Sequence, residues 1–191
     1  MAKNKTYSVQ YRRKREGRTD YKKRMKLLLG QKPRIVLRKS LKHLRLQLIQ
    51  FKPSGDEVIA TANTSELAKF GWKGNTANTS AAYLTGLLLA KKTKNKIECV
   101  LDIGQTSSVK GSIIYAAVQG CNDGGLKVPC AKEVVPEMSR IKGEHIAQYA
   151  RNLRSEKEKF EKQFSRYVKA GIDPETLPSH FEQVKGKIGA Q

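Results

Sequence analysis

The amino-acid sequence predicts a mixed α/β fold, in which a three-stranded antiparallel meander is extended by further strands and covered by helices. Apolar and polar residues alternate between residues 34 and 64, and from about residue 77 the apolar residues recur at helical spacing. A length of 191 residues suits one compact domain with appendages, or two small domains. We therefore expect a basic N-terminal extension, a globular body and C-terminal helices, at residues 1–33, 34–150 and 151–191.

The predicted meander consists of three segments joined by short connections. The middle segment alternates most clearly, because one of its faces carries Leu44, Leu46 and Leu48. The returning segment carries Val58, Ala60 and Ala62 on one face, and the Pro-Ser-Gly-Asp sequence before it predicts a turn. The expected strands span residues 34–40, 43–51 and 57–64.

Two helices and two short strands are predicted for the rest of the body. The first helix runs to about residue 92 and has Asn75 or Thr76 as its N-terminal cap. The second starts near residue 112 and ends at Asn122 or at the two glycines that follow. The strands are expected at 97–104 and 126–130, the second at a sheet edge because it contains Pro129.

A short helix is predicted in the basic N-terminal extension. Thr19 or Asp20 is its expected N-terminal cap and Gly30 ends it. We expect the three leucines before Gly30 to attach the end of this helix to the core. The rest of the extension has too few apolar residues for a core of its own, so we expect it to be loosely structured without a partner.

A longer helix is predicted near the C-terminus. Ser155 and Glu158 have the spacing of a capping box, and Gly171 lies just past the expected helix end. The helix presents an apolar stripe for packing, formed by Phe160, Phe164, Tyr167 and Val168. Asp173, directly before a proline, starts another turn or helix.

Positive charge is concentrated near the N-terminus. The formal net charge is +21, and residues 1–45 contain 17 of the 38 Lys and Arg but only two of the 17 acids. An arm this basic is typical of proteins that bind a polyanion, and nucleic acid is favoured because each neutralised phosphate releases condensed counterions. An anionic membrane surface is the alternative. No stretch approaches 18 apolar residues and no signal-peptide core is present, so we expect a cytoplasmic protein without a membrane partner.

The residue types in the arm favour RNA over DNA. Arginine pairs bidentately with phosphate, and aromatic rings stack on unpaired bases. No segment resembles a recognition helix for the DNA major groove. Positive charge continues at Lys32 and into the first strand, where Arg34 and Arg38 share a face and are expected to extend the basic surface onto the sheet. The interleaved residues of the arm are Tyr7, Tyr11, Arg12, Arg13, Arg15, Arg18 and Tyr21.

Signals for catalysis or for a cofactor are weak. Glycine-rich phosphate loops and Gly-x-Ser-x-Gly are absent, and no cofactor is implied. The three cysteines lack the close pairing of zinc ligands and are expected to be buried free thiols. The alternative function is a metal-dependent nuclease acting on structured RNA, with Glu57, Asp102 and Asp123 as ligands. Surface or capping roles are the favoured interpretation of these three acids.

Four segments together resemble one family of proteins. They are REGRTDYKKRMKLL at 15–28, GWKGNTANTSAAYLTGLLLAKK at 71–92, AAVQGCNDGGLKVP at 116–129 and IKGEHIAQYARNL at 141–153. They resemble the eighteen family of large-subunit ribosomal proteins, which binds 5S ribosomal RNA, in its archaeal and eukaryotic form. The compact length is similar to that of archaeal members.

The resemblance implies a structural protein of the large ribosomal subunit with no catalytic activity. Its expected partners are 5S rRNA, large-subunit rRNA and neighbouring ribosomal proteins, and the mixed α/β body would hold 5S rRNA in the central protuberance. The GWKGNTANT loop is a second candidate RNA edge, although helix capping and a glycine turn explain the loop equally well. The RNA-binding residues so expected are Tyr7, Tyr11, Arg12, Arg13, Lys14, Arg15, Arg18, Tyr21, Lys22, Lys23, Arg24, Lys32, Arg34, Arg38, Lys73, Asn75 and Asn78.

Overall fold

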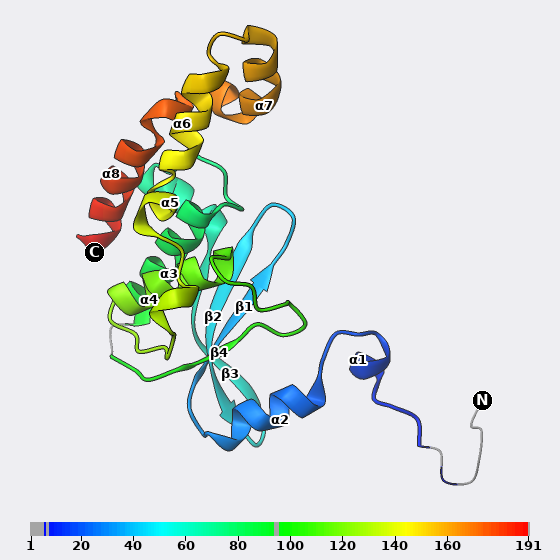
Figure 1. Cartoon of the computed structure of the whole chain (residues 1–191). Helices are drawn as coiled ribbons and strands as arrows, with labels where there is room; N and C mark the ends of the chain where they lie inside the picture. Colours follow the sequence, from blue (N-terminus) through cyan, green and yellow to red (C-terminus); the bar gives the residue numbers. More distant parts are fainter. Residues whose placement is uncertain (1–5, 7, 94–95, 191) are drawn as a thin grey trace.

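A computed structural model describes residue 6, residues 8–93 and residues 96–190 of the chain. Tyr7, one of the expected RNA-binding residues, therefore lies outside the described residues. The predicted mixed α/β class is confirmed: a mixed sheet is covered by helices, and a basic arm projects from the sheet end of the molecule (Figure 1).

Within the described residues, the sheet has four strands in the order β3-β2-β1-β4. The antiparallel meander is confirmed, with β1 paired to β2 and β2 paired to β3. The fourth strand joins in parallel to β1, with Val36 opposite Asp102. The strands are β1 (Arg34–Lys39), β2 (Leu44–Lys52), β3 (Gly55–Asn63) and β4 (Val100–Asp102).

The predicted faces hold for β2 but only partly for β3. Leu44, Leu46 and Leu48 are buried, as their alternation indicates. On β3 a register shift after Leu48 places Val58 opposite Ile49 instead of on the face that Ala60 and Ala62 share. Val58 is consequently 48% exposed. A bulge adds one residue to one strand and so reverses the side-chain order beyond it, which strict alternation cannot reveal.

The expected strands after the meander are shorter than predicted. The segment 97–104 contributes only three residues of β4. The segment 126–130 forms no strand, and Lys127 makes a single isolated bridge with Glu98. The backbone of Val128 instead bonds the side chain of Asn122 at both its N–H and its C=O, so that side chain takes the place of a neighbouring strand.

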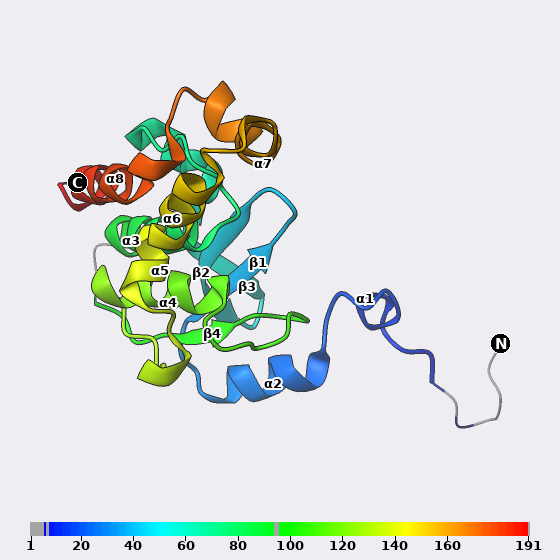
Figure 2. The same ribbon diagram turned by 45° about the horizontal axis from the view of Figure 1, so that its top comes forward.

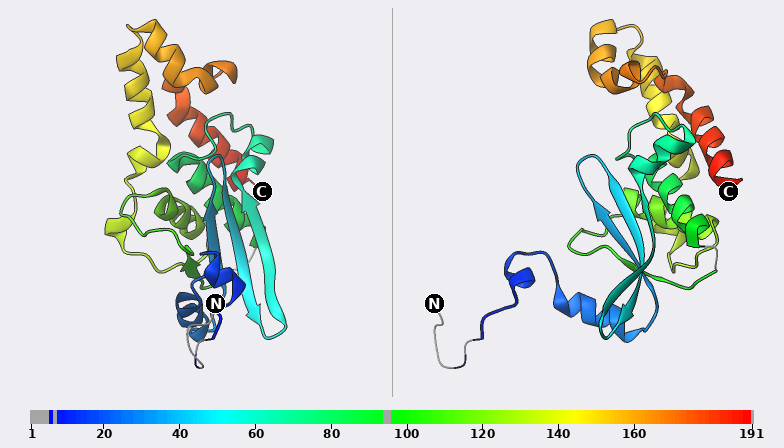
Figure 3. Two further views of the ribbon diagram at one scale, coloured as in Figure 1. Left: turned by 90° about the vertical axis from the view of Figure 1, so that its right-hand side faces the viewer. Right: turned by 180° about the vertical axis from the view of Figure 1, so that it is seen from behind.

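Helices α3 (Thr79–Thr93) and α4 (Ile113–Asp123) cover one face of the sheet. Figure 3 shows the helices after the meander grouped on one side of the strands, apart from the two helices of the arm. Helix α3 is buried along almost its whole length, because β2, β3, α4 and the C-terminal helix α8 (Leu177–Gly189) all pack against it. Its cap is Asn78, whose side chain accepts the backbone N–H of Ala81, and neither of the two predicted residues has this role.

Helices α3 and α4 approach each other so closely that their backbones are in contact. A Cβ atom added at Gly120 would lie 2.0 Å from the carbonyl oxygen of Tyr83, and one at Gly86 would lie 2.1 Å from that of Ala117. Any larger residue at either position would force the two backbones apart. These two glycines therefore set the distance between the helices and, with it, the thickness of the core.

The C-terminal half ends in short helices that return to α3. The chain runs out from the body through α6 and α7, turns, and returns along the body in α8 (Figure 2). On α8, the ring of Phe181 lies 5.6 Å from that of Tyr83 between centroids. Short helical turns η1 (Thr64–Phe70) and η2 (Lys132–Val134) connect earlier elements. The remaining elements are α5 (Met138–Lys142), α6 (Glu144–Leu153), α7 (Lys157–Lys169), η3 (Pro174–Thr176) and α8 (Leu177–Gly189).

The predicted details of α7 are partly correct. Gly171 lies just past the helix in the left-handed region, and Asp173 caps the next turn, both as expected. The capping box is wrong, because the helix begins at Lys157 and its N-cap Glu156 makes no side-chain capping bond. The apolar stripe is buried at Phe164 and Tyr167, but Val168 is exposed.

The basic arm contains α1 (Arg12–Arg15) and α2 (Tyr21–Leu29). Asp20 caps α2 by accepting the backbone N–H groups of Lys22 and Lys23, and Gly30 follows its last residue, as predicted. Leu27 and Leu28 are partly buried, whereas Leu29 is exposed. Figure 1 shows α2 beneath the sheet, and α1 extending away from the body.

Candidate nucleic-acid interface

The outer part of the arm is held together by contacts among its own residues. Arg13 donates from Nε to the hydroxyl of Thr19 at 3.0 Å. Glu16 pairs with Arg12 and Arg18, at 3.4 and 3.1 Å. Around the same turn, the rings of Tyr11 and Tyr21 lie 5.3 Å apart between centroids. The short helix α1 and the start of α2 thus form one folded unit instead of an extended tail.

Most cations of this unit point to solvent. Arg12 and Arg18 keep much of their side chains exposed beside Glu16. Tyr11 is 74% exposed and presents a planar ring next to them. Within the described part of the chain, no ion pair is formed by Lys14, Arg15, Lys22, Lys23 or Lys26. The exposed surface of the arm is therefore strongly positive.

The inner part of the arm is attached to the sheet through Asp56. The guanidinium of Arg24, on α2, donates from Nη2 to both carboxylate oxygens of Asp56 at 2.9 Å. Arg34, on β1, donates to the same carboxylate, also at 2.9 Å. Partial burial alone would raise the pKa of Asp56, but the hydrogen bonds from Arg24 and Arg34 outweigh it, so that this pKa lies below its usual value.

A second carboxylate extends the same set of contacts. Arg34 donates from Nη1 to Asp102, at the end of β4, at 3.0 Å. Asp102 also accepts from Arg38 at 3.3 Å and from the backbone N–H of Gly104 at 2.9 Å. The guanidinium of Arg38 lies directly against Gly104, where an added Cβ would be 2.9 Å from its central carbon.

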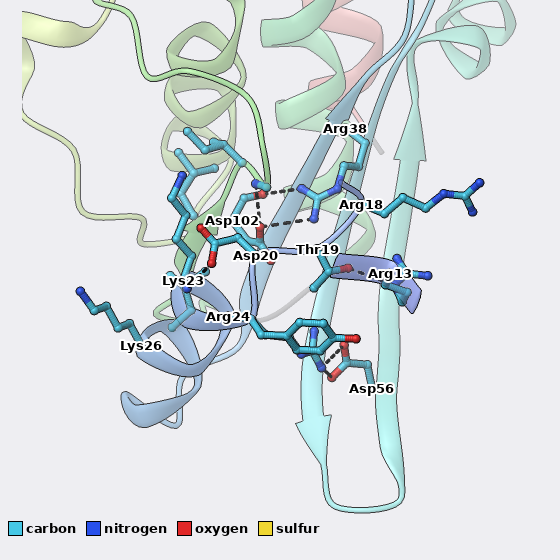
Figure 4. Close-up of a pocket in the computed structure, with 15 residues that line it drawn as sticks. Arg13, Arg18, Thr19, Asp20, Lys23, Arg24, Lys26, Arg38, Asp56 and Asp102 are labelled. Atoms are coloured by element: carbon cyan, nitrogen blue, oxygen red, sulfur yellow. Dashed lines mark hydrogen bonds and ion pairs between the residues drawn. The ribbon is translucent and has the colours of Figure 1, made fainter. Parts of the chain in front are cut away.

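A groove of about 720 Å³ lies between the arm and this edge of the sheet (Figure 4). Six cations and three aspartates line it, and the apolar side chains of Leu27, Leu101 and Ile103 form part of its wall. The other lining residues are Arg13, Arg18, Thr19, Asp20, Tyr21, Lys23, Arg24, Lys26, Arg38, Asp56, Asp102 and Gly104. The groove brings together predicted site residues from the arm and from β1.

The expectation that Arg34 extends the basic surface is wrong. Arg34 and Arg38 do share a face of β1, since both reach Asp102. However, Arg34 is 1% exposed and its charge is balanced by Asp56 and Asp102. Asp56 was missed because its sequence context reads as a turn. The surface or capping role expected of Asp102 is also incorrect, since Asp102 is buried.

The second candidate edge, at residues 71–79, combines capping with one exposed cation. Asn75 and Asn78 use their side-chain oxygens to accept backbone N–H groups of Ala77 and Ala81, at 2.9 Å each. Lys73 is exposed, and its backbone N–H donates to His180. Lys73 and Arg166 line a small polar cleft beside this loop. Lys32, the remaining predicted cation, pairs with Glu98 at 2.6 Å.

The three acids weighed as metal ligands have separate partners. Glu57 pairs with Lys52 at 2.6 Å, and Asp123 accepts the hydroxyl of Tyr83 at 2.6 Å. Asp102 is held by arginines, as described above. No group of three or more potential ligands that could hold a metal ion occurs among the residues that the structure describes.

The cysteines are free thiols, as expected, but only Cys99 and Cys121 are buried, since Cys130 is partly exposed. Burial raises the pKa of Cys99 to about 11 and that of Cys121 to about 12, and it also raises the pKa of the half-buried Cys130. Separately, no helix in the described part of the chain is long and apolar enough to cross a membrane.

A mixed α/β body with an exposed polycationic arm is typical of proteins that bind a nucleic acid. Comparison with known proteins identifies the family. Residues 5–98 match the family described as "Ribosomal large subunit proteins 60S L5, and 50S L18". The chain is also 51% identical over 191 residues to "Large ribosomal subunit protein uL18" of Desulfurococcus amylolyticus, which covers 98% of this chain and 97% of that protein.

The chain therefore belongs to the uL18 family of large-subunit ribosomal proteins. This confirms the resemblance found in the sequence, including its archaeal character. The family is structural and not enzymatic, so the nuclease alternative is wrong. Its place is in the ribosome, in the cytoplasm, among ribosomal RNA and other ribosomal proteins.

Proposed function

We propose that this protein binds 5S rRNA through its basic arm and attaches that RNA to the large-subunit rRNA in the central protuberance. The proposal rests on family membership together with one structural observation, the concentration of exposed cations on a folded arm. The body, which carries much less excess charge for its length, supplies the rigid surface that meets RNA by shape.

The exposed cations of the arm neutralise phosphates, and Tyr11 stacks on an unpaired base. Arginine and lysine differ in these roles, because the planar guanidinium binds phosphate bidentately while the ammonium acts as a point charge. Phosphate contacts fix position and base contacts fix specificity. The phosphate-binding residues so proposed are Arg12, Arg13, Lys14, Arg15, Arg18, Lys22 and Lys23, with Lys32 and Lys73 at the edges of the surface.

The first test is a filter-binding titration of the protein against 5S rRNA, with tRNA as competitor, at 50 and 200 mM salt. If about six to ten phosphates are neutralised, affinity falls by about three to five decades between these salt concentrations. Binding to 5S rRNA that tRNA does not displace supports the proposal. Equal affinity for the two RNAs would refute specific 5S recognition and leave only charge attraction.

Two matched pairs of substitutions distinguish the contribution of the arm's cations to 5S rRNA binding from that of positive charge elsewhere on the protein. Lys14→Gln with Arg15→Gln removes two exposed charges from α1, whereas Lys157→Gln with Lys162→Gln removes two from α7. The α1 pair is expected to weaken 5S binding and to reduce the salt slope by about two, because each lost phosphate contact lowers it by about one. Equal effects of the two pairs would show that the arm has no special role.

A further inference from the structure

Three arginines and two aspartates form a continuous line of alternating charges from the arm into the sheet. Its order is Arg24, Asp56, Arg34, Asp102, Arg38, with every neighbouring pair between 2.9 and 3.3 Å apart. Figure 4 shows the dashed contacts at Asp56 and at Asp102 on either side of the groove. The line connects α2 with three strands, since the residues lie on α2, β3, β1 and β4.

The position of Arg24 in this line differs from that of its neighbours on α2. Its guanidinium donates hydrogen bonds to both carboxylate oxygens of Asp56, and the buried Arg34 donates to the same carboxylate. Lys22 and Lys23, by contrast, are exposed, and no ion pair is seen for either within the described residues. Arg24 thus binds the sheet through Asp56, while the two lysines that precede it are exposed to solvent.

We propose that Asp56 and Arg24 are positioning residues for RNA binding: they hold α2 at a fixed angle to the sheet, so that the exposed cations of the arm match the spacing of phosphates. This inference rests on the proposed function, because it concerns the same surface. It removes Arg24 and Arg34 from the set of phosphate contacts. It also gives a role in RNA binding to an acidic residue that itself repels RNA.

The sign of the effect at Asp56 makes this inference testable. If charge alone mattered, replacing Asp56 by a neutral residue would strengthen RNA binding, because it removes a negative charge near the phosphates. If Asp56 positions the arm, the same change weakens binding to the specific RNA, because a misoriented arm no longer meets several phosphates at once. Non-specific binding does not depend on the arm's angle and stays equal or becomes tighter.

The experiment compares four variants of the full chain by the same titration. Asp56→Asn and Arg24→Gln are each expected to lower 5S affinity about fivefold or more, as loss of a partly buried ion pair would. The double variant should bind 5S rRNA about as tightly as the single variant with the lower affinity, because both substitutions break the same Arg24–Asp56 contact. Lys22→Gln is the charge-matched control for Arg24→Gln on the same helix. Arg24→Gln leaves the Asp56–Arg34 pair in place, so it remains informative if Asp56→Asn does not fold.

Hydrogen exchange of the α2 amides provides a readout that does not depend on which RNA binds. Faster exchange in α2 of Asp56→Asn and Arg24→Gln, but not of Lys22→Gln, supports anchoring of the arm. Unchanged exchange, unchanged or tighter 5S binding by Asp56→Asn, or equal reductions of the salt slope by Arg24→Gln and Lys22→Gln would each overturn the inference. If the wild type fails to prefer 5S rRNA over tRNA, the proposed function fails, and hydrogen exchange alone decides whether Asp56 anchors the arm.

Discussion

The contact between α3 and α4 predicts that alanine has opposite effects at glycines of different helices. At Gly120 an added Cβ would lie 2.0 Å from the carbonyl oxygen of Tyr83, whereas ordinary contact begins at 3.4 Å. The two backbones would have to separate by about 1.4 Å, which is the difference between these distances. At Gly186, on α8, an added Cβ meets no atom within 4 Å.

The free energy of unfolding follows from these two environments. Overpacking of a tight core costs about 3 kcal/mol at the upper end of its usual range, and here backbone must move instead of a flexible side chain. Alanine regains about 1 kcal/mol of helix propensity, so Gly120→Ala is expected to lose about 2 kcal/mol or more. Gly186→Ala gains helix propensity without any overpacking, so it is expected to be more stable than the wild type by about 0.5–1 kcal/mol.

Urea unfolding at 25 °C, followed by circular dichroism at 222 nm, measures both variants against the wild type. Gly86→Ala serves as a second test of the same contact, because its Cβ would lie 2.1 Å from the carbonyl oxygen of Ala117. If Gly120→Ala were as stable as Gly186→Ala, the helices could separate without cost, and the reasoning from close backbone contact would be refuted.

Two further predictions concern titratable groups. With a thiol reagent at pH 8, Cys130 should react in the folded protein, whereas the buried Cys99 and Cys121 should react only after unfolding. Equal reaction rates of all three thiols in the folded protein would contradict this difference in burial. The pKa of His180 is lowered, mainly by burial and further by the nearby charges of Lys73 and Lys187. Its ring stacks on that of Trp72, with 5.2 Å between the ring centroids. The unfolded chain therefore binds this proton more readily, so stability should fall as pH drops below about 6.5. Denaturation at pH 7.5 and 5.5, followed by Trp72 fluorescence, tests this, and His180→Gln should show a smaller pH dependence.

The elements that could be predicted from the sequence are those with a local signal. The leucines of β2, the turn before β3, and the Asp20 cap of α2 each depend on residues within a few positions of one another. The bulge near Leu48 and the parallel pairing of β4 depend on distant chain segments and leave no such pattern. The missing capping box of α7 shows that a correct spacing does not ensure the contact.

The candidate site divides in the same way. The exposed cations of the arm follow from composition, because so many charges in so short a segment cannot be buried together. The burial of Arg34 could not be predicted, since it requires Asp56 and Asp102 to come from two other strands. The division of the chain at residues 33 and 150 stays a prediction, as do the individual RNA contacts.

The ion-pair line also fixes an order of events during synthesis. The arm is the first part of the chain to be made, but the carboxylates that anchor it come later: Asp56 lies 32 residues after Arg24, and Asp102 lies 68 residues after Arg34. Asp102 lies on β4, so the line of ion pairs behind Asp56 is complete only when β4 has joined the sheet. The contact that attaches the arm to the body can therefore form only after the strand that carries Asp56 has been made.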